Sequence, residues 1–142
     1  MAMRWPFCRH CAVALRLVGC VHTITRLYLP DSHNPRFDAA EATQALEQYL
    51  SVQCPARLEA KKSDRGDVRL TITTDTSGAV TQAELTSSSG DDMIDGLFGT
   101  VAAQLKVDSL RAPKPPAATR HVHMGFSCAP SAAVATLELT RS

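Results

Sequence analysis

Two histidines are the residues of this 142-residue sequence best spaced to do chemistry together. His121 and His123 lie two positions apart, so on a β-strand both side chains project from one face, where a third ligand would complete a metal site. The interpretation we favour is a pair of polar side chains on a solvent-facing strand. Cys8 and Cys11 have the spacing of a redox or metal-binding half-site, but no second pair follows them. We therefore expect no metal site and no cofactor.

Hydroxyl and carboxylate groups gather between positions 87 and 95 without forming a catalytic group. The serine run at 87–89 lacks the Gly-x-Ser-x-Gly motif that exposes a nucleophilic serine. Asp91, Asp92 and Asp95 lie at the expected start of a helix, where capping explains acidic residues without a catalytic pair or a calcium loop. Because no nucleophile, base and orienting group can be assembled, we expect no enzymatic activity.

Length and charge narrow the class of protein. A chain of 142 residues with 44% hydrophobic content can bury the core of one domain without metals. The formal net charge is +1 and there is no basic block, so nothing indicates nucleic-acid binding.

The elements that would position these groups begin with a predicted hairpin. From Gly66 to Asp75, apolar residues alternate with polar ones, which is the period of a strand with one buried face. Asp75 and Gly78 bound a turn, since an acceptor side chain opens it and a glycine free to adopt positive φ closes it. A second strand follows over 79–86, where a break in the alternation after Val80 indicates a β-bulge.

Helical periodicity appears in two places. A helix capped by Asp91 or Asp92 carries one apolar stripe, formed by Met93, Ile94, Leu97, Phe98, Val101 and Leu105. Earlier in the chain, residues 38–52 form a predicted helix with a capping box that begins at Asp38. Pro55 is expected to end this helix.

Extended segments close the chain. The proline-rich segment at 113–116 excludes helix and leads into a predicted strand over 119–128. Apolar and polar residues alternate again over 135–140, which fits a half-buried strand. Such a strand would cover the edge of the sheet, whereas a frayed tail would leave that edge open.

The order strand, turn, strand, helix, proline segment, strand resembles the C-terminal domain of the TonB and TolA envelope proteins. The matching motifs are Gly66 at the first strand, the turn at 75–78, Ser88-Ser89-Gly90 after the second strand, Ile94-Asp95 near the start of the helix, and the TolA-like Pro113-Lys114-Pro115-Pro116. The resemblance covers somewhat under half of the chain. It implies an α+β fold in which a small antiparallel sheet, of strand-strand-helix-strand order, packs against two helices.

The resemblance also implies a function. In the family the last strand offers an exposed edge, to which an extended segment of a partner protein adds as a further strand. The corresponding residues here are His121, Val122, His123, Met124, Gly125 and Phe126. We therefore predict a non-enzymatic protein-binding module of the cell envelope. The alternative is a structural or assembly protein that forms homodimers through the same edge and has no energy-coupling role.

The N-terminal segment has the features of a bacterial export signal. Arg4 and Arg9 precede an apolar run, and Leu17-Val18-Gly19-Cys20 resembles a lipobox, in which the cysteine is lipidated and becomes the mature N-terminus. Arg16 interrupts the apolar run, so a cytosolic arm or a start placed too early is the alternative.

Processing at this motif would define the organisation of the chain. We predict a signal peptide over 1–19, a tether over 20–37 and the folded domain over 38–142. The domain would lie in the periplasm, held to a membrane by the lipid on Cys20. Val21, the residue after the lipidated cysteine, favours the outer membrane.

Two of the five cysteines would then remain in the folded part of the chain. Cys54 and Cys128 form a candidate disulfide, since an even pair suits an oxidising compartment. The alternative is two buried free thiols, because cysteine is readily buried.

Overall fold

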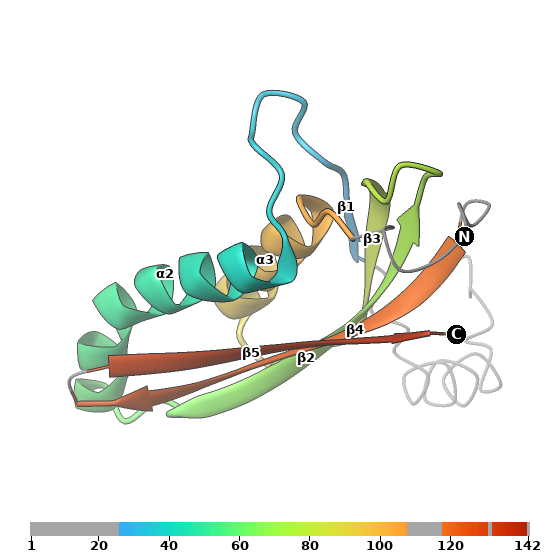
Figure 1. Ribbon diagram of the computed structural model, residues 1–142. Coiled ribbons are helices and arrows are strands. Elements are labelled where there is room, and N and C mark those ends of the chain that lie inside the picture. The colour runs from blue at the N-terminus through green and yellow to red at the C-terminus, as the bar shows by residue number, and fades with distance from the viewer. Residues whose placement is uncertain (1–25, 108–117, 131, 142) are drawn as a thin grey trace, which may run out of the picture.

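The computed structural model describes residues 26–107, 118–130 and 132–141. Its centre is a five-stranded antiparallel sheet, in the order β1-β3-β2-β4-β5, with two helices on one face (Figure 1). The elements are β1 (Arg26–Tyr28), α2 (Ala39–Glu59), β2 (Arg65–Thr74), β3 (Val80–Ser87), α3 (Asp92–Ala103), β4 (Ala118–Ala129) and β5 (Ala132–Arg141). The predicted α+β class, an antiparallel sheet with two helices, is confirmed.

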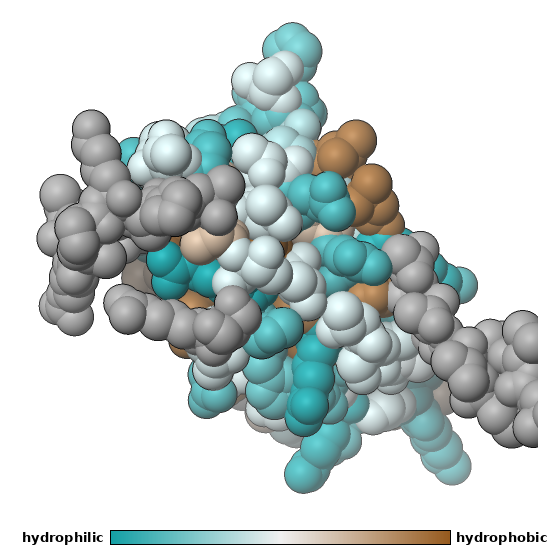
Figure 2. Space-filling view, turned by 90° about the vertical axis from the view of Figure 1, so that its right-hand side faces the viewer, coloured by the Kyte–Doolittle hydropathy of each residue, from teal (hydrophilic) through white to brown (hydrophobic). Residues whose placement is uncertain are grey.

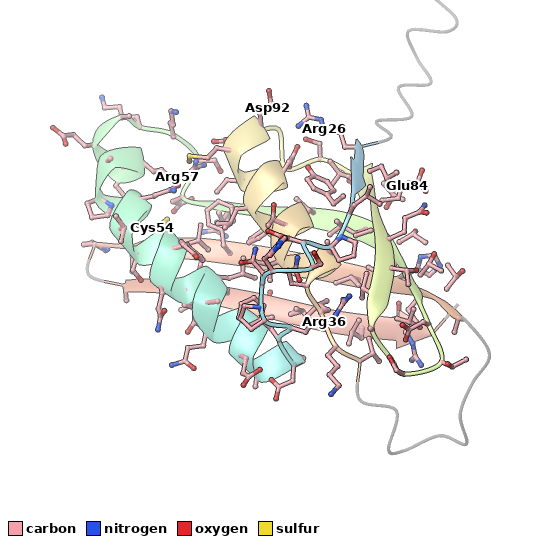
Figure 3. All side chains as sticks on the ribbon, turned by 90° about the horizontal axis from the view of Figure 1, so that it is seen from above. Arg26, Arg36, Cys54, Arg57, Glu84 and Asp92 are labelled. Atoms are coloured by element: carbon pink, nitrogen blue, oxygen red, sulfur yellow. A yellow bond between two sulfur atoms is a disulfide. The ribbon has the colours of Figure 1, made fainter. Side chains whose placement is uncertain are left out.

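Apolar side chains from both layers meet between the sheet and the helices. Figure 3 shows α2 and α3 side by side across the sheet. Phe98 of α3 and Phe126 of β4 meet edge to face, with ring centroids 6.0 Å apart, a favoured aromatic geometry. The largest fully buried side chains include Phe98, Leu46, Leu50, Leu70, Ile72, Leu85, Ile94, Leu105 and Met124.

The β2–β3 hairpin has the predicted turn and bulge. Asp75 accepts a hydrogen bond from the hydroxyl of Ser77, which lowers the pKa of Asp75. Gly78 has a φ of +85°, and a Cβ there would lie 2.1 Å from the carbonyl oxygen of Val107, so conformation and packing both require glycine. A register shift at the end of β2 nearest the turn confirms the bulge.

Both helices begin at aspartate caps. The carboxylate of Asp38 accepts a hydrogen bond from the N–H of Glu41 at 2.8 Å, and Glu41 accepts one from the N–H of Asp38 at 3.0 Å. Asp91 accepts hydrogen bonds from the N–H groups of Met93 and Ile94. Of the two aspartates proposed to cap α3, Asp91 is therefore the one that does so.

Helix α2 continues through Pro55 to Glu59, so the prediction that Pro55 ends it is wrong. Proline removes the N–H that would bond to the carbonyl of Ser51. Both Ser51 and Pro55 are exposed, so water can hydrate that carbonyl. The turn after the proline is held in place by the buried residues Cys54 and Arg57.

The segment predicted as a tether over 20–37 contains an edge strand. Arg26 bonds to Asp92 at 2.7 Å between Nη2 and Oδ1, and Figure 3 shows this pair where β1 meets α3. The ring of Tyr28 lies directly against Gly99 of α3, where an added Cβ would be 2.3 Å from it. The tether prediction is therefore wrong for its described part, because β1 belongs to the folded domain.

Candidate functional site

Strand β4 lies inside the sheet rather than at its edge. The residues predicted to form the binding edge pair with β2 on one side and with β5 on the other: His121, Val122, His123, Met124, Gly125 and Phe126. The prediction that they are the exposed edge is wrong, because the C-terminal segment forms a full strand that covers them. The edge position belongs to β5.

The backbone groups of β5 alternate between β4 and the outside. Cys128 of β4 donates its N–H to the carbonyl of Asp64 on the β2 side. Because backbone direction repeats every second residue of a strand, the N–H and C=O of Phe126 also point to β2, and Phe126 forms a non-hydrogen-bonded pair with Ala135 of β5. The N–H of Ala135 accordingly points outward, where it donates to Oε1 of Glu47 at 3.1 Å. By the same alternation the outward-facing backbone groups belong to Ala133, Ala135, Leu137, Leu139 and Arg141.

No strand within residues 26–107, 118–130 and 132–141 pairs with this outer side of β5. Ala133 and Ala135 are buried on the helix side, whereas Leu137 and Leu139 are half-buried there. Val134, Thr136, Glu138 and Thr140 lie on the opposite, solvent-facing side. The strand contains no proline or glycine and its pairing with β4 has no bulge, so two of the devices that protect an edge from pairing are missing, whereas Glu47 of α2 protects the edge at Ala135.

The opposite edge strand is much shorter. Strand β1 has three residues, begins at the first described residue, and pairs among the described strands with β3. Its side chains Arg26 and Tyr28 are engaged with α3. Strand β5, with ten residues, therefore offers the longer template for an added strand.

The two histidines lie on the face of the sheet that no described helix covers. His123 Nε2 is 2.9 Å from Asp67 Oδ2, and His121 Nδ1 is 3.3 Å from the hydroxyl of Thr71. Both histidines are exposed, as the interpretation of polar residues on a solvent-facing strand predicts. In the part of the chain that the structure describes, no three His, Cys, Asp or Glu side chains are grouped so as to hold a metal ion.

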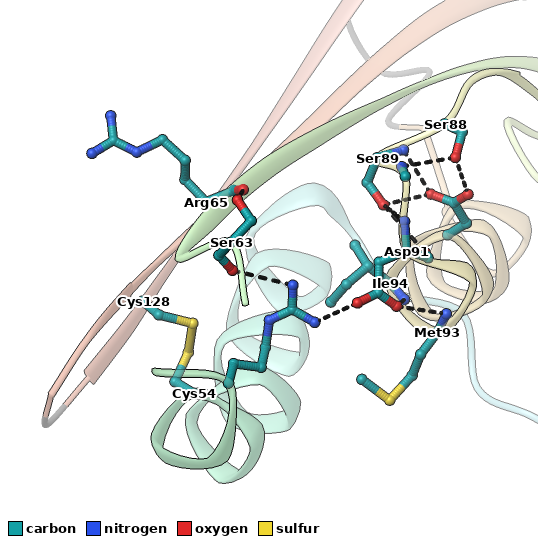
Figure 4. A network of polar contacts seen from close by, with 12 residues as sticks. Cys54, Ser63, Arg65, Ser88, Ser89, Asp91, Met93, Ile94 and Cys128 are labelled. Atoms are coloured by element: carbon teal, nitrogen blue, oxygen red, sulfur yellow. Dashed lines mark hydrogen bonds and ion pairs between the residues drawn. A yellow bond between two sulfur atoms is a disulfide. The ribbon is translucent and has the colours of Figure 1, made fainter. Parts of the chain in front are cut away.

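A buried carboxylate explains the Ser-Ser-Gly and Ile-Asp motifs. Asp95 is fully buried and accepts hydrogen bonds from the hydroxyls of Ser88 and Ser89 and from the N–H of Ser89, at 2.5, 2.7 and 2.8 Å (Figure 4). These bonds attach the end of β3 to the first turn of α3. The serines therefore have a structural role, and no histidine is among the partners of Asp95.

A second network, beside the first, was not predicted. The guanidinium of Arg57 donates to Asp91 at 2.6 Å and to the carbonyl of Ser63 at 3.2 Å (Figure 4), and it lies 5.3 Å from the ring centroid of Phe126. The hydrogen bond from Arg57 lowers the pKa of Asp91, and the N–H groups at the start of α3 act in the same direction. Arg57 thus ties the last turn of α2 to the cap of α3.

The predicted disulfide between Cys54 and Cys128 is confirmed. It joins α2 to the end of β4, with Cα atoms 5.4 Å apart (Figure 4). Cys20, the predicted lipidation site, and the signal peptide over 1–19 lie outside the described residues. Neither described helix is long and apolar enough to cross a membrane.

Apolar surface is sparse on the end of the molecule seen in Figure 2. Hydrophilic and neutral side chains dominate this view, and hydrophobic surface is confined to small areas. The exposed large hydrophobic residues of the described chain are scattered over several elements: Leu27, Leu29, Tyr49, Val52, Met93 and Val134.

Comparison of the chain with protein-family models, with curated proteins and with solved structures gives no match. The resemblance to the TonB and TolA domains therefore stays a prediction.

Proposed function

We propose that this chain is a non-enzymatic protein-binding module of the bacterial cell envelope, which recognises its partner by β-strand addition along β5. The observation that carries the proposal is the row of outward-facing backbone groups on this ten-residue edge strand. An extended partner segment would gain main-chain hydrogen bonds at Leu137 and Leu139. Successive side chains of the partner segment would lie alternately on the helix side of the sheet, beside the half-buried leucines, and on its polar, solvent-facing side.

The envelope location is supported by the cysteines. The Cys54–Cys128 disulfide suits an oxidising compartment. The motif that ends at Cys20 resembles a lipobox, so we propose a lipoprotein on the periplasmic side of a membrane, with the outer membrane favoured by Val21.

The alternative is self-association through the same edge. Two copies of β5 can pair antiparallel about a two-fold axis, because Leu137 and Leu139 present the same groups in each copy. The protein would then be a structural homodimer with no energy-coupling role.

The test combines a photo-crosslinking residue with a proline at the edge. A photoreactive residue replaces exposed Thr140 on β5 or, as a control, Val52 on α2, which is 81% exposed. Leu137→Pro removes one outward N–H without removing a bond to β4, and Leu137→Val keeps that N–H.

We expect a partner adduct in the bacterial envelope at position 140 but not at 52. It should be lost in Leu137→Pro and kept in Leu137→Val, at matched melting temperatures. An adduct that survives the proline would refute strand addition at β5. An adduct of twice the mass of the chain, with a dimer in sedimentation, would establish the self-association alternative instead.

A further inference from the structure

One side chain already accepts a hydrogen bond from a backbone N–H of the proposed binding edge. Glu47 of α2 is half-buried, and its Oε1 accepts the outward N–H of Ala135 at 3.1 Å. The carboxylate therefore takes the place that the carbonyl of an added strand would take. Beyond it, Leu137 and Leu139 have outward N–H groups for which the described residues supply no partner strand.

From this geometry, and on the basis of the proposed function, we infer that Glu47 determines where the added strand ends and selects the charge of the partner residue opposite Ala135. The partner is an extended segment of another protein that pairs with Leu137 and Leu139. It extends to Ala135 only where it carries a lysine or arginine opposite that residue.

The reason is the fate of the carboxylate when a strand arrives. A partner carbonyl that bonds to the N–H of Ala135 displaces Glu47 and leaves its charge beside the new backbone. A carboxylate that loses a hydrogen-bond donor while water is excluded is costly. A cationic side chain compensates for that loss, because directly opposite residues of antiparallel strands project from the same face. Ala135 faces the helix layer, so the cation would lie on the side from which Glu47 reaches the edge.

The hydrogen bond from Ala135 to Glu47 is tested first in the free protein, without any partner. Amide exchange followed by NMR should show the N–H of Ala135 protected about tenfold more than those of Leu137 and Leu139, the size expected for one hydrogen bond to a charged group. Glu47→Ala should remove this difference, whereas Gln48→Ala, at the exposed neighbouring position on α2, should leave it unchanged. Equal exchange rates at Ala135 in the wild type and in Glu47→Ala would show that Glu47 does not protect this N–H, and would overturn the inference.

Charge selection is tested with two blocked peptides, Lys-Thr-Val-Thr-Val-Thr-Lys and Glu-Thr-Val-Thr-Val-Thr-Glu. Each places valine on the helix side and threonine on the polar side of β5, and the matching ends make the test independent of strand direction. Whichever end reaches Ala135, the other end lies opposite Arg141, and this contribution is the same in the wild type and in Glu47→Gln, which keeps an acceptor oxygen but loses the charge of Glu47. We therefore expect Glu47→Gln to lower the ratio of lysine-peptide affinity to glutamate-peptide affinity about fivefold at low salt.

The outcomes separate the inference from the function beneath it. If neither peptide protects the amides of Leu137 and Leu139, strand addition at β5 is refuted together with its charge selection. If both peptides protect those amides and Glu47→Gln does not change their relative affinities, strand addition stands and selection by Glu47 is overturned.

Discussion

Loss of the Cys54–Cys128 bond should remove a large part of the stability of the domain. The bond closes a loop with a sequence separation of 74 residues. The chain-entropy relation gives about 15 cal/mol/K for a loop of this length, or about 4.4 kcal/mol at 25 °C. Since small domains unfold with about 5–15 kcal/mol, the domain without the bond should be close to its stability limit.

The assay is equilibrium urea unfolding of the wild type, Cys54→Ala, Cys128→Ala and the double variant. Each single variant loses the same bond, so the double variant should be little less stable than either one, and the effects should not add. Reductant should destabilise the wild type but leave the double variant unchanged. The first amides to lose protection should be those after Pro55, because that turn of α2 lacks one helix hydrogen bond and is anchored beside it by the disulfide.

Two results would contradict this reasoning. A loss below about 1 kcal/mol would mean that loop closure is not the main contribution of the bond. Strictly additive effects of the two single variants would mean that the packing of each side chain dominates.

The remaining predictions concern α3. Gly99→Ala should destabilise the domain by about 1–3 kcal/mol through overpacking, since the new Cβ would lie 2.3 Å from the Tyr28 ring, and should expose the amides of β1 to exchange. Gly96→Ala, in the same helix but with no described atom within 4 Å of the new Cβ, should instead stabilise by about 0.5–1 kcal/mol; equal effects would contradict the proposed contact. Because Arg57 lowers the pKa of Asp91, that carboxylate stabilises the fold above its ordinary pKa of about 4, and the contribution is lost as the pH falls through the lowered value. Urea unfolding between about pH 5 and pH 2 should therefore be less pH-dependent in Arg57→Met than in the wild type, and identical slopes would show that the pair contributes nothing.

Local signals predicted those elements whose cause lies within a few residues of the chain. The turn from Asp75 to Gly78 follows from an acceptor side chain and a glycine at positive φ, and the structure contains both. The caps of the helices follow equally from aspartates before apolar periodic segments. The alternation over 135–140 predicted a strand, and β5 is that strand.

The incorrect predictions share a different cause. Pro55 ends a helix by local rules, yet the disulfide and the Arg57 network anchor the turn beyond it. The described part of strand β1 has three residues, too few for alternation to be visible, and it is held by contacts with α3. In each case the decisive partner is distant in sequence, so no pattern in the segment itself indicates it.

The location of the binding edge shows most directly why function here requires the tertiary structure. Alternation over 135–140 is the same whether that segment covers β4 or remains a tail, so it predicts a strand without predicting which strand is outermost. The pairing of β5 with β4 moves the open edge by one strand and changes every candidate binding residue. The same pairing brings Ala135 to Glu47, which is 88 residues away in the sequence. Glu47 has no signal of its own in the sequence, since a glutamate in a helix is ordinary; its proposed role exists only because α2 crosses the edge at that residue.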